Sequence, residues 1–364
     1  MTSLRVVDLY AGAGGLSRGF EEAGAEIVMA VEASHKAVRT YRVNHPDVVV
    51  LEESIDEHWN VVQRLEESVD DPSCSVLIGG PPCQGWSTIG GRGNGAHRAR
   101  LNACIEHFVT QVGLLRPPAV VMENVRGLAS KEGGKHLRRV MERLEELGYQ
   151  ASIHDVRAAD FGVPQLRHRI FVVAILRELG VEYELHPTHR PDEWVTVWQA
   201  IGDLPSLSAG ESATDYDMNP RSDFQQGMRC EHGLLTWHEA PNHSERMLEV
   251  LRALRQEGAS RAEIGSQVTL TSGFHNTYCR LWSDRPAPAV TSSAGRISSG
   301  RNAHPFDDRA LTPREAARLQ TFPDDYRWEG KRWSVYQQIG NAVPPELAKR
   351  VAAPLLEGLA TALA

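Results

Sequence analysis

A cysteine in a turn rich in glycine and proline is the first residue that could act as a nucleophile. Cys83 lies in the segment Gly79-Gly-Pro-Pro-Cys-Gln-Gly-Trp-Ser-Thr88, directly after the apolar run SVLIGG. The two prolines stiffen the approach and the glycines allow a sharp turn, so we expect the thiol at the end of a strand. A free thiol has a pKa of about 8.5 and attacks as the thiolate. By itself, the motif predicts either a nucleophile or an inert cysteine in a turn.

Two further segments supply acidic and basic groups. Glu123-Asn-Val125 follows the apolar run AVVM, and a carboxylate at a strand end can hold or donate a proton on a heteroaromatic ring. Gln165-Leu-Arg-His-Arg169 enters the run RIFVVAIL and places two arginines on one side of a strand. Taken singly, either segment could equally form a surface ion pair.

A glycine-rich segment near the start of the chain has the pattern of a ligand-binding turn. Asp8-Leu-Tyr-Ala-Gly-Ala-Gly-Gly-Leu-Ser-Arg-Gly-Phe20 follows a predicted strand and opens a predicted helix, whose first N–H groups are available to a ligand. Glu32 ends the second predicted strand, where a carboxylate can accept hydrogen bonds from ribose hydroxyls. The pattern fits NAD, FAD, S-adenosylmethionine or a plain tight turn. Its glycine spacing differs from GxGxxG, which disfavours a dinucleotide.

These motifs need a scaffold, and short apolar runs alternate with helical patterns between residues 4 and 176. The runs LRVVDLY, EIVMAVE, SVLIGG, AVVMENV and RIFVVAIL are rich in Val and Ile and short enough for buried strands. Helical spacing marks Gly15 to Ala23 and Gly134 to Leu147. This alternation predicts an α/β fold with a doubly wound, mainly parallel sheet, in which ligands bind beyond the carboxyl ends of the strands. The motifs fall at those ends.

The pattern changes between residues 177 and 308, where periodicity weakens and Pro, Gly, Ser, His and Trp become frequent. We expect a smaller, loop-rich domain there, with a helix near Ser244 to Glu257. Another helix should begin after Thr312, because a proline takes the first helical position and Glu315 completes a capping box. A last helix, Pro345 to Leu363, has apolar spacing and should pack back on the sheet.

The composition is that of a globular protein. The chain has 364 residues, of which 41% are hydrophobic and 24% charged. Its five scattered cysteines do not indicate a disulfide framework. The start, MTSLRVVDLY, lacks the features of a signal peptide, and no apolar run approaches membrane-spanning length. A cytoplasmic protein with reduced thiols is therefore expected.

Charge by itself does not point to nucleic acid, because the formal net charge is -8. Basic residues nevertheless gather in three places along the chain. These are Arg92, His97, Arg98 and Arg100; Arg167, His168 and Arg169; and Arg280, Arg285, Arg296 and Arg301. A local basic cleft on an acidic body is compatible with DNA binding.

Together and in this order, these segments resemble the DNA (cytosine-5) methyltransferase family. Two C-terminal segments extend the match, ALTPREAARLQTFPDDY at 310–326 and QIGNAVPP at 338–345. The resemblance covers residues 4–176 and 290–352, about two thirds of the chain. Six ordered motifs do not agree by chance, so the resemblance outweighs the structural reading of each motif. It implies the class I methyltransferase fold, which is Rossmann-like.

The resemblance implies a role for each catalytic position. Cys83 corresponds to the nucleophile that adds to carbon 6 of a cytosine flipped out of duplex DNA. Glu123 corresponds to the carboxyl group that binds the amino and ring-nitrogen edge of the base. Arg169 corresponds to the arginine on the base carbonyl, and Arg167 to the arginine beside the thiol. Carbon 5 then takes the methyl group, and loss of its proton expels the thiolate.

The resemblance also implies S-adenosyl-L-methionine as methyl donor, with S-adenosyl-L-homocysteine as product and no metal. The residues that correspond to the cofactor pocket are Asp8, Tyr10, Ala11, Gly12, Gly14, Gly15, Leu16, Glu32, Ala33, Ser54, Ile55, Gly80, Pro81, Asn341 and Ala342. The residues that correspond to contacts with DNA or the target base are Pro82, Gln84, Ser87, Arg98, Gln165 and Thr291.

The chain departs from the family pattern at two places. Where the family usually has an Asp-Ile pair at the adenine, this chain has Ser54-Ile55, with Glu53 and Asp56 as neighbours. The adenine contact is therefore expected from Ser54, from a neighbouring acid or from backbone. In Ala96-His-Arg-Ala-Arg-Leu101, the customary acidic residue before the arginine is absent. Neither departure affects the methyl-transfer step, so an active enzyme is expected.

Three other interpretations of the sequence have to be compared with a DNA methyltransferase. A relative that methylates tRNA would carry a short Cys-Phe-Thr signature, which the sequence does not contain. A silent DNA-binding protein of this fold would not need Cys83, Glu123 and Arg169. A zinc module of Cys230, His232, His238 and His243 matches no standard zinc spacing.

The resulting prediction has two domains. A catalytic and cofactor-binding domain comprises residues 1–176 and 335–364, and a small domain comprises 177–334. Target recognition should lie within residues 185–300, the part that resembles the family least. We expect a monomer that acts on double-stranded DNA, with no membrane partner. A bacterial or phage restriction-modification type is expected, and the sequence leaves three settings open, namely partner of a separate restriction endonuclease, phage protein or solitary regulator.

Overall fold

The computed structural model describes residues 3–82, 95–229, 234–264 and 277–364, with the backbone alone for 95–102 and 131–132. Contacts within the chain define two compact units. The first comprises Met1–Arg157, His168–Pro187 and Pro345–Ala364, and the second comprises Ala158–Arg167 and Thr188–Pro344.

The units do not divide at residues 176 and 335, where the change of sequence pattern predicts the boundaries. Residues up to Pro187 stay with the first unit, where the Tyr183 hydroxyl donates to the carbonyl oxygen of Val351, 3.0 Å away. The chain returns to the first unit only at Pro345, because the helix before it packs within the second unit. Periodicity reports local structure, so it does not show where an extended segment packs.

Within the described residues, one seven-stranded sheet organises the first unit. Its strands are β1 (Arg5–Leu9), β2 (Glu26–Val31), β3 (Val49–Leu51), β4 (Val76–Gly79), β5 (Ala119–Val125), β6 (Tyr149–Arg157) and β8 (His168–Leu176). Their order is β3-β2-β1-β4-β5-β8-β6. The first five pair in parallel, whereas β8 is antiparallel to both β5 and β6. The predicted mainly parallel sheet is confirmed.

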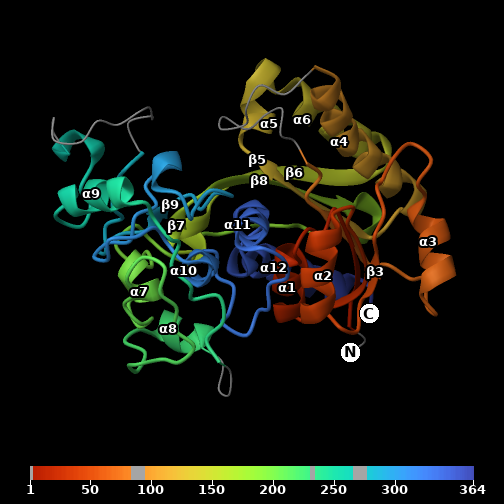
Figure 1. Cartoon of the computed structure of the whole chain (residues 1–364). Helices are drawn as coiled ribbons and strands as arrows, with labels where there is room; N and C mark the ends of the chain where they lie inside the picture. Colours follow the sequence, from red (N-terminus) through yellow and green to blue (C-terminus); the bar gives the residue numbers. More distant parts are fainter. Residues whose placement is uncertain (1–2, 83–94, 230–233, 265–276) are drawn as a thin grey trace. The chain divides into compact units, whose positions relative to one another are not determined.

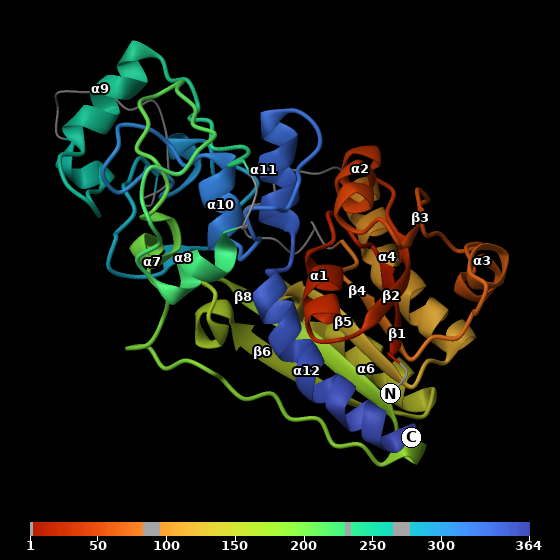
Figure 2. The same ribbon diagram turned by 90° about the horizontal axis from the view of Figure 1, so that it is seen from below.

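Helices cover both faces of this sheet, as a doubly wound fold requires (Figures 1 and 2). The helices of this unit are α1 (Gly15–Glu22), α2 (His35–Asn44), α3 (Val61–Ser68), α4 (Gly95–Leu115), α5 (Gly127–Ser130), α6 (Lys135–Glu146) and α12 (Pro345–Ala362). In Figure 1, α4, α5 and α6 lie on one side of the sheet and α1, α2 and α12 on the other. Among the described residues, no helix is both long and apolar enough to cross a membrane.

The last helix packs against the first. A Cβ on Gly19 of α1 would lie 2.3 Å from the Ala348 Cβ and 2.5 Å from the Pro345 carbonyl oxygen of α12. Real side chains do not tolerate such distances, so glycine is required for this close packing. The predicted C-terminal helix is confirmed, and Gly19 explains how it fits.

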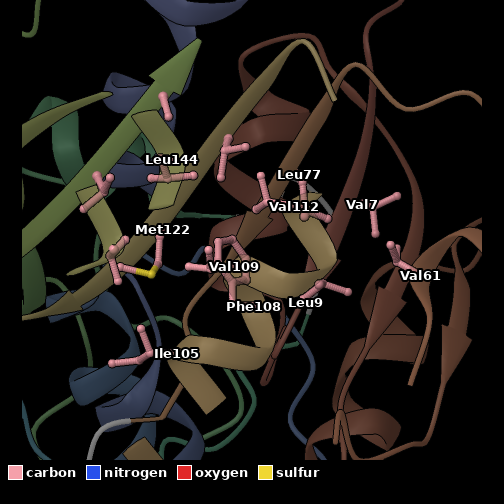
Figure 3. Close-up of a cluster of buried hydrophobic side chains, with 14 of the residues drawn as sticks. Val7, Leu9, Val61, Leu77, Ile105, Phe108, Val109, Val112, Met122 and Leu144 are labelled. Carbon is pink, nitrogen blue, oxygen red and sulfur yellow. The ribbon is translucent and has the colours of Figure 1, made fainter. Parts of the chain in front are cut away.

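The core of the first unit fills the space between the sheet and α4. Leu9, Leu77 and Met122 come from three adjacent strands and are almost completely buried. Phe108 and Val112 of α4 pack into the same cluster (Figure 3). The strands that are buried on both faces are those with continuous Val and Ile runs in the sequence.

The second unit has short elements joined by long loops. Its helices are α7 (Val197–Ile201), α8 (Asp223–Met228), α9 (Glu245–Ala253), α10 (Pro313–Leu319) and α11 (Arg332–Asn341), and two short strands, β7 (Gln165–Leu166) and β9 (Ala287–Pro288), pair in parallel. The predicted capping box before α10 is confirmed, because Glu315 N donates to Thr312 Oγ1 and Thr312 N donates to Glu315 Oε2. The helix expected near Ser244 is α9.

Buried ion pairs lie in and around α10. Arg309 Nη2 lies 2.7 Å from Glu315 Oε1, and both side chains are fully buried. Burial alone would raise the pKa of Glu315, but the adjacent Arg309 guanidinium holds that pKa well below its usual range. Arg318 contacts Asp203 and Asp324 in the same way. Because an unpaired buried charge is costly, these pairs fix the local fold rather than add much stability.

Candidate active site

Two strands of the first unit, β1 and β4, end side by side next to the last residues of β5, and a predicted site segment lies at each of these places. The register pairs Leu9 of β1 with Gly79 of β4, and Gly79 with Met122 of β5. The residues that follow are Tyr10, Gly80 and Glu123. The sheet therefore brings the glycine-rich turn, the approach to Cys83 and the predicted acid to one edge, as the topology of a parallel sheet requires.

Gly79 allows the ends of β1 and β4 to lie this close together. A Cβ there would lie 2.4 Å from the Leu9 carbonyl oxygen and 2.8 Å from the Phe108 ring. Leu9 and Gly79 could not approach each other with any larger residue at position 79. Gly79 belongs to the cysteine motif in the sequence but is not among the predicted site residues.

The turn after β1 is built around backbone conformations that glycine favours. Gly12 has φ 58° and Gly14 has φ 91°, and a Cβ on Gly12 would meet nothing within 4 Å. The Gly12 N–H donates to Glu32 Oε2 over 2.9 Å, and Ser34 N–H donates to Glu32 Oε1 over 2.7 Å. Burial raises the pKa of Glu32, against the effect of these two donors. The turn and the carboxylate thus form an open cradle with glycine at its floor.

Asp8 supports the turn from inside the protein. Its side chain is fully buried, and its Oδ2 accepts a 2.6 Å hydrogen bond from Ser17 Oγ, which in turn accepts from the Tyr41 hydroxyl. Ser17 lies in the first turn of α1, whose N-cap, Gly14, has no side chain to offer. Asp8 therefore holds the start of α1. Burial raises the pKa of Asp8 from 3.8 to about 7.

The remaining predicted cofactor residues of the first unit surround this cradle in different environments. Ala11, Gly15 and Leu16 are buried in the turn and at the start of α1. Ala33 is exposed directly after Glu32. These residues therefore combine a buried turn after β1 with an exposed residue after β2.

At the segment where the family pattern is broken, Ser54 is exposed and Ile55 is buried. The acids beside them already have partners, because Glu53 Oε2 accepts from Trp59 Nε1 at 2.7 Å and Asp56 Oδ1 accepts from His58 N at 2.9 Å. The structure thus favours Ser54 and backbone over Glu53 as the polar groups for a ligand at this place.

Glu123 and Arg169 form an ion pair at the end of β5 and the start of β8. Arg169 Nε lies 2.6 Å from Glu123 Oε1, and the two side chains are 15% and 12% exposed. Arg169 Nη1 also donates to the His168 carbonyl oxygen over 2.7 Å. The pair is rigid, close to the surface and able to present a carboxylate and a guanidinium to one ligand.

Asn124, which the sequence interpretation did not select, links this pair to the cysteine motif. Its Nδ2 donates to the Pro81 carbonyl oxygen over 3.1 Å. Pro81 is buried and Pro82 is half-buried. The position of Asn124 directly after Glu123 was the only signal for this role in the sequence.

In the second unit, the structure brings five other predicted residues together. Arg167 donates to the carbonyl oxygens of Val290, Gly340 and Ala342 over 3.0, 3.0 and 3.1 Å. Gln165 donates to Leu319 O and accepts from Val290 N. The predicted residues in this group are Gln165, Arg167, Thr291, Asn341 and Ala342.

Close packing joins the Thr291 segment to the QIGNAVPP motif. A Cβ on Gly340 would lie 2.2 Å from Ser292 N and 2.3 Å from the Thr291 carbonyl carbon. Asn341 is exposed at the end of α11. Arg167 and Gln165 are buried, and their hydrogen bonds hold backbone segments in place. In this structure both residues act as supports for Thr291 and Ala342.

Several predicted positions lie outside the described residues, namely Cys83, Gln84, Ser87, Cys230 and His232. Arg98 belongs to α4, but its side chain is likewise outside the description. Of the four residues weighed for zinc, His238 contacts Thr312 Oγ1 and Pro205 O, and His243 Nε2 accepts from Ala310 N. No group of three potential metal ligands occurs among the described residues.

The fold is that of an α/β protein with a mainly parallel sheet, and its predicted site residues in the first unit lie near the ends of the strands. The family model for C-5 cytosine-specific DNA methylase matches residues 4–357. The chain therefore belongs to the C-5 cytosine-specific DNA methylase family, and it is an enzyme that methylates cytosine in DNA. This assignment excludes the silent DNA-binding protein and favours DNA over RNA as substrate.

Individual relatives agree with the family assignment. Type II methyltransferase M1.HphI of Haemophilus parahaemolyticus is 38% identical over 98% of this chain and 87% of its own length. Type II methyltransferase M.DdeI of Desulfomicrobium norvegicum is 33% identical over 96% of this chain and 88% of its own length. Among solved structures, an E. coli prophage-encoded protein assigned as a DNA modification methyltransferase superposes with a TM-score of 0.79 at 25% identity, covering 98% of this chain and all of the other.

Proposed function

We propose that the chain transfers a methyl group from S-adenosyl-L-methionine to carbon 5 of a cytosine in duplex DNA, with Cys83 as nucleophile. The observation that carries the proposal is the ion pair of Glu123 and Arg169, next to the turn that Asn124 links to Pro81. The edge of cytosine offers an amino group, a ring nitrogen that can be protonated and a carbonyl oxygen. A carboxyl group and a guanidinium held side by side match that edge.

Each chemical step then has one group of the chain to perform it. The Cys83 thiolate adds to carbon 6, and the displaced electron pair is stabilised as Glu123 shares a proton with ring nitrogen 3. Arg169 binds the carbonyl oxygen, where negative charge also develops. Carbon 5 then has enamine character and would form a bond to the methyl carbon of the donor, whose bond to the sulfonium sulfur breaks so that S-adenosyl-L-homocysteine leaves. Loss of the carbon 5 proton to a base restores the ring and expels the Cys83 thiolate.

The cradle after β1 fits a nucleoside-bearing methyl donor. Gly12 leaves open space beside the backbone, and Glu32 is a carboxylate of the kind that binds ribose hydroxyls. Ser54 is the exposed polar side chain proposed to face the adenine. S-adenosyl-L-methionine supplies an electrophilic methyl group on a sulfonium when it is bound. In the second unit, Asn341 and Ala342 are the proposed cofactor residues.

The DNA substrate must expose one base for this chemistry, at a cost of a few kcal/mol of lost stacking and pairing. We assign target recognition to residues 185–300, and the support of the flipped nucleotide to Thr291. Because the similar proteins are named Type II methyltransferases, we also propose a restriction-modification role, with a separate endonuclease and a monomeric enzyme.

A covalent trap tests the proposal. Duplex DNA with 5-fluorocytosine in place of cytosine, drawn from a library of random sequences, is incubated with the enzyme and S-adenosyl-L-methionine. Fluorine blocks the final proton loss, so elimination of the thiolate cannot follow methyl transfer. We expect a shifted band on a denaturing gel for the wild type and for Cys74→Ser, a control thiol in the core.

The same gel separates the proposed nucleophile from the other cysteines. Cys83→Ser should give no shifted band, because a hydroxyl is a far weaker nucleophile at neutral pH. It should still bind its preferred DNA in a filter assay. A band of wild-type intensity for Cys83→Ser would remove this residue from its proposed role.

A further inference from the structure

We infer that one face of α4 positions the cofactor cradle and the adenine segment together, with Tyr10 and His107 as the positioning residues. The inference rests on the proposed cofactor function and deepens it. It also explains how the adenine segment can be held at Ser54, where this chain lacks the carboxylate that is usual in the family.

The face of α4 consists of Cys104, His107, Phe108 and Gln111, which follow the spacing i, i+3, i+4 and i+7. Residues with this spacing lie in one row along a helix. The row does not simply contribute to the apolar core, because three of its four members make hydrogen bonds to other segments. Two of these segments, the turn at Tyr10 and the backbone at Ile55, belong to the predicted cofactor region. The third, residues 59–61, follows Ile55 a few residues later in the chain.

The first contact holds the turn after β1. The Tyr10 hydroxyl donates to the carbonyl oxygen of Cys104 over 3.1 Å, and the bond is partly buried. Tyr10 has φ 61°, a left-handed conformation that a residue with a bulky side chain adopts only when its surroundings impose it. The Tyr10 hydroxyl is thus attached to α4, while the Tyr10 side chain packs against the apolar core of the first unit.

The second contact holds the adenine segment. His107 Nδ1 lies 3.2 Å from the carbonyl oxygen of Ile55. A carbonyl oxygen can only accept, so Nδ1 must carry the hydrogen. The bond fixes the backbone directly after Ser54, the exposed residue proposed to face the adenine. Backbone held in this way can present Ser54 without help from a carboxylate.

The third contact closes the same segment at its other end. Gln111 is buried, accepts from Val61 N over 2.9 Å and donates to Trp59 O over 2.8 Å. Residues 55–61 are therefore attached to α4 at both ends. Phe108, between these polar contacts, packs where a Cβ on Gly79 would collide with its ring. One rigid helix face thus contacts the turn, the adenine segment and the strand before the cysteine motif.

These contacts predict how a variant that loses one of the hydrogen bonds to α4 should behave. Loss of a hydrogen bond to a backbone carbonyl leaves the pocket chemistry intact but lets a pocket wall move. Affinity for the cofactor should fall, whereas the steps on the cytosine ring should not change. A net hydrogen bond is worth about 0.5–1.5 kcal/mol, which corresponds to about twofold to tenfold in affinity.

Binding of S-adenosyl-L-homocysteine, measured by calorimetry without DNA, tests the inference directly. Tyr10→Phe keeps the aromatic ring and loses only the hydroxyl donor. Tyr149→Phe is the matched control, because its hydroxyl donates to the Pro117 carbonyl oxygen over 2.8 Å elsewhere in the same unit. We expect weaker binding for Tyr10→Phe and wild-type binding for Tyr149→Phe. Equal affinities for Tyr10→Phe and the wild type would overturn the role of Tyr10.

For His107, rescue by a conservative variant separates positioning from a general loss of structure. The amide nitrogen of His107→Asn can take the place of Nδ1, whereas His107→Ala has no donor. His107→Ala should raise the KM for S-adenosyl-L-methionine with little change in kcat, and His107→Asn should recover most of the affinity. Equal behaviour of the two variants would overturn the role of His107, provided that both melt cooperatively.

The outcomes distinguish this inference from the function on which it rests. A wild-type enzyme that binds no S-adenosyl-L-homocysteine would refute the proposed cofactor. A wild-type enzyme that binds it, beside Tyr10→Phe and His107→Ala variants that bind it equally well, would refute the positioning role of α4 alone.

Discussion

The side chain of Asn124 joins the predicted acid to the predicted nucleophile turn, because its Nδ2 donates to the carbonyl oxygen of Pro81 over 3.1 Å. Asn124 Oδ1 also accepts from the N–H of Val125 over 2.9 Å. The residue after Glu123 therefore sets the path of the chain two residues before Cys83. Its role is geometric, and it can be tested without touching either reacting group.

Asn124→Asp should lower kcat about 10-fold to 100-fold, since small displacements of a reacting group can have effects of that size. The carboxylate keeps the volume and the acceptor of Asn124 but would repel the Pro81 carbonyl oxygen. Gln225→Glu is a matched control, because Gln225 Nε2 donates to the Trp198 carbonyl oxygen in the second unit. Single-turnover methylation rates would decide, and a rate for Asn124→Asp equal to that of Gln225→Glu would refute the role.

Glu123→Gln should reduce the methylation rate by about 100-fold or more, the usual range for a lost general acid or base. The amide can still bind the base edge, but it cannot share a proton with ring nitrogen 3. It also breaks the ion pair with Arg169, which lies 2.6 Å away. DNA binding by filter assay should weaken far less than the rate. Equal losses in binding and rate would indicate a structural role.

Asp8 should make the stability of the protein depend on pH. Its pKa in the folded chain is about 7, raised from 3.8 first of all by burial and further by the charges of Glu32 and Glu21. A raised pKa means that the folded state prefers the protonated carboxyl group. This stabilisation is fully present below the pKa that the Asp8 carboxyl has in the unfolded chain, and it is lost as pH rises through about 7.

Asp8→Asn removes this titration while its side-chain oxygen can still accept from Ser17. Each pKa unit corresponds to about 1.4 kcal/mol. As pH rises from 5 to 8, the free energy of unfolding of the variant should therefore increase by up to a few kcal/mol relative to that of the wild type. Thermal unfolding at a series of pH values would measure this gain. A constant difference in stability across that pH range would show that Asp8 does not titrate there.

The sheet could be predicted because its central strands are buried on both faces. Val6, Val7 and Leu9 are all apolar and completely buried, so the run itself identifies the strand. The edge strand β6 was missed, because it mixes buried Tyr149 with exposed Asp155. Such a strand has neither a continuous apolar run nor strict alternation. β3 was missed because it has only three residues.

The site was predictable where a motif is local and not where it depends on packing. The glycine turn and Glu32 are recognisable from their own sequence and from their spacing. The bond from Tyr10 to Cys104 joins residues 94 positions apart, and nothing in either segment predicts it. The Arg167 guanidinium donates to the carbonyl oxygens of Val290, Gly340 and Ala342, which are 123 to 175 positions away in the sequence. These contacts follow from tertiary packing alone.

Residues 185–300 should carry the choice of target sequence, and their exchange with those of a relative should redirect methylation without changing the chemistry. From Thr188 onwards they lie in the second unit. Contacts to base edges discriminate by about 1–3 kcal/mol each, so a few side chains are enough to alter the site. Trp282 is one candidate, because Arg301 and Arg285 stack on its ring at 3.6 and 4.9 Å.

The chimera must keep the buried side chains that hold backbone segments of the second unit in place. Arg280 donates to the carbonyl oxygens of Leu251, Leu254 and His304, so the chimera has to keep an arginine at this position. The decisive comparison is between bisulfite maps of DNA from cells that express the parent and the chimera. We expect the chimera to methylate the relative's sequence. A folded, active chimera that kept the parent's sequence would instead assign recognition to the glycine-rich segment after Cys83. In that segment and the start of α4, Arg92 to Arg100 are expected to contact phosphates of any sequence and to set the salt dependence.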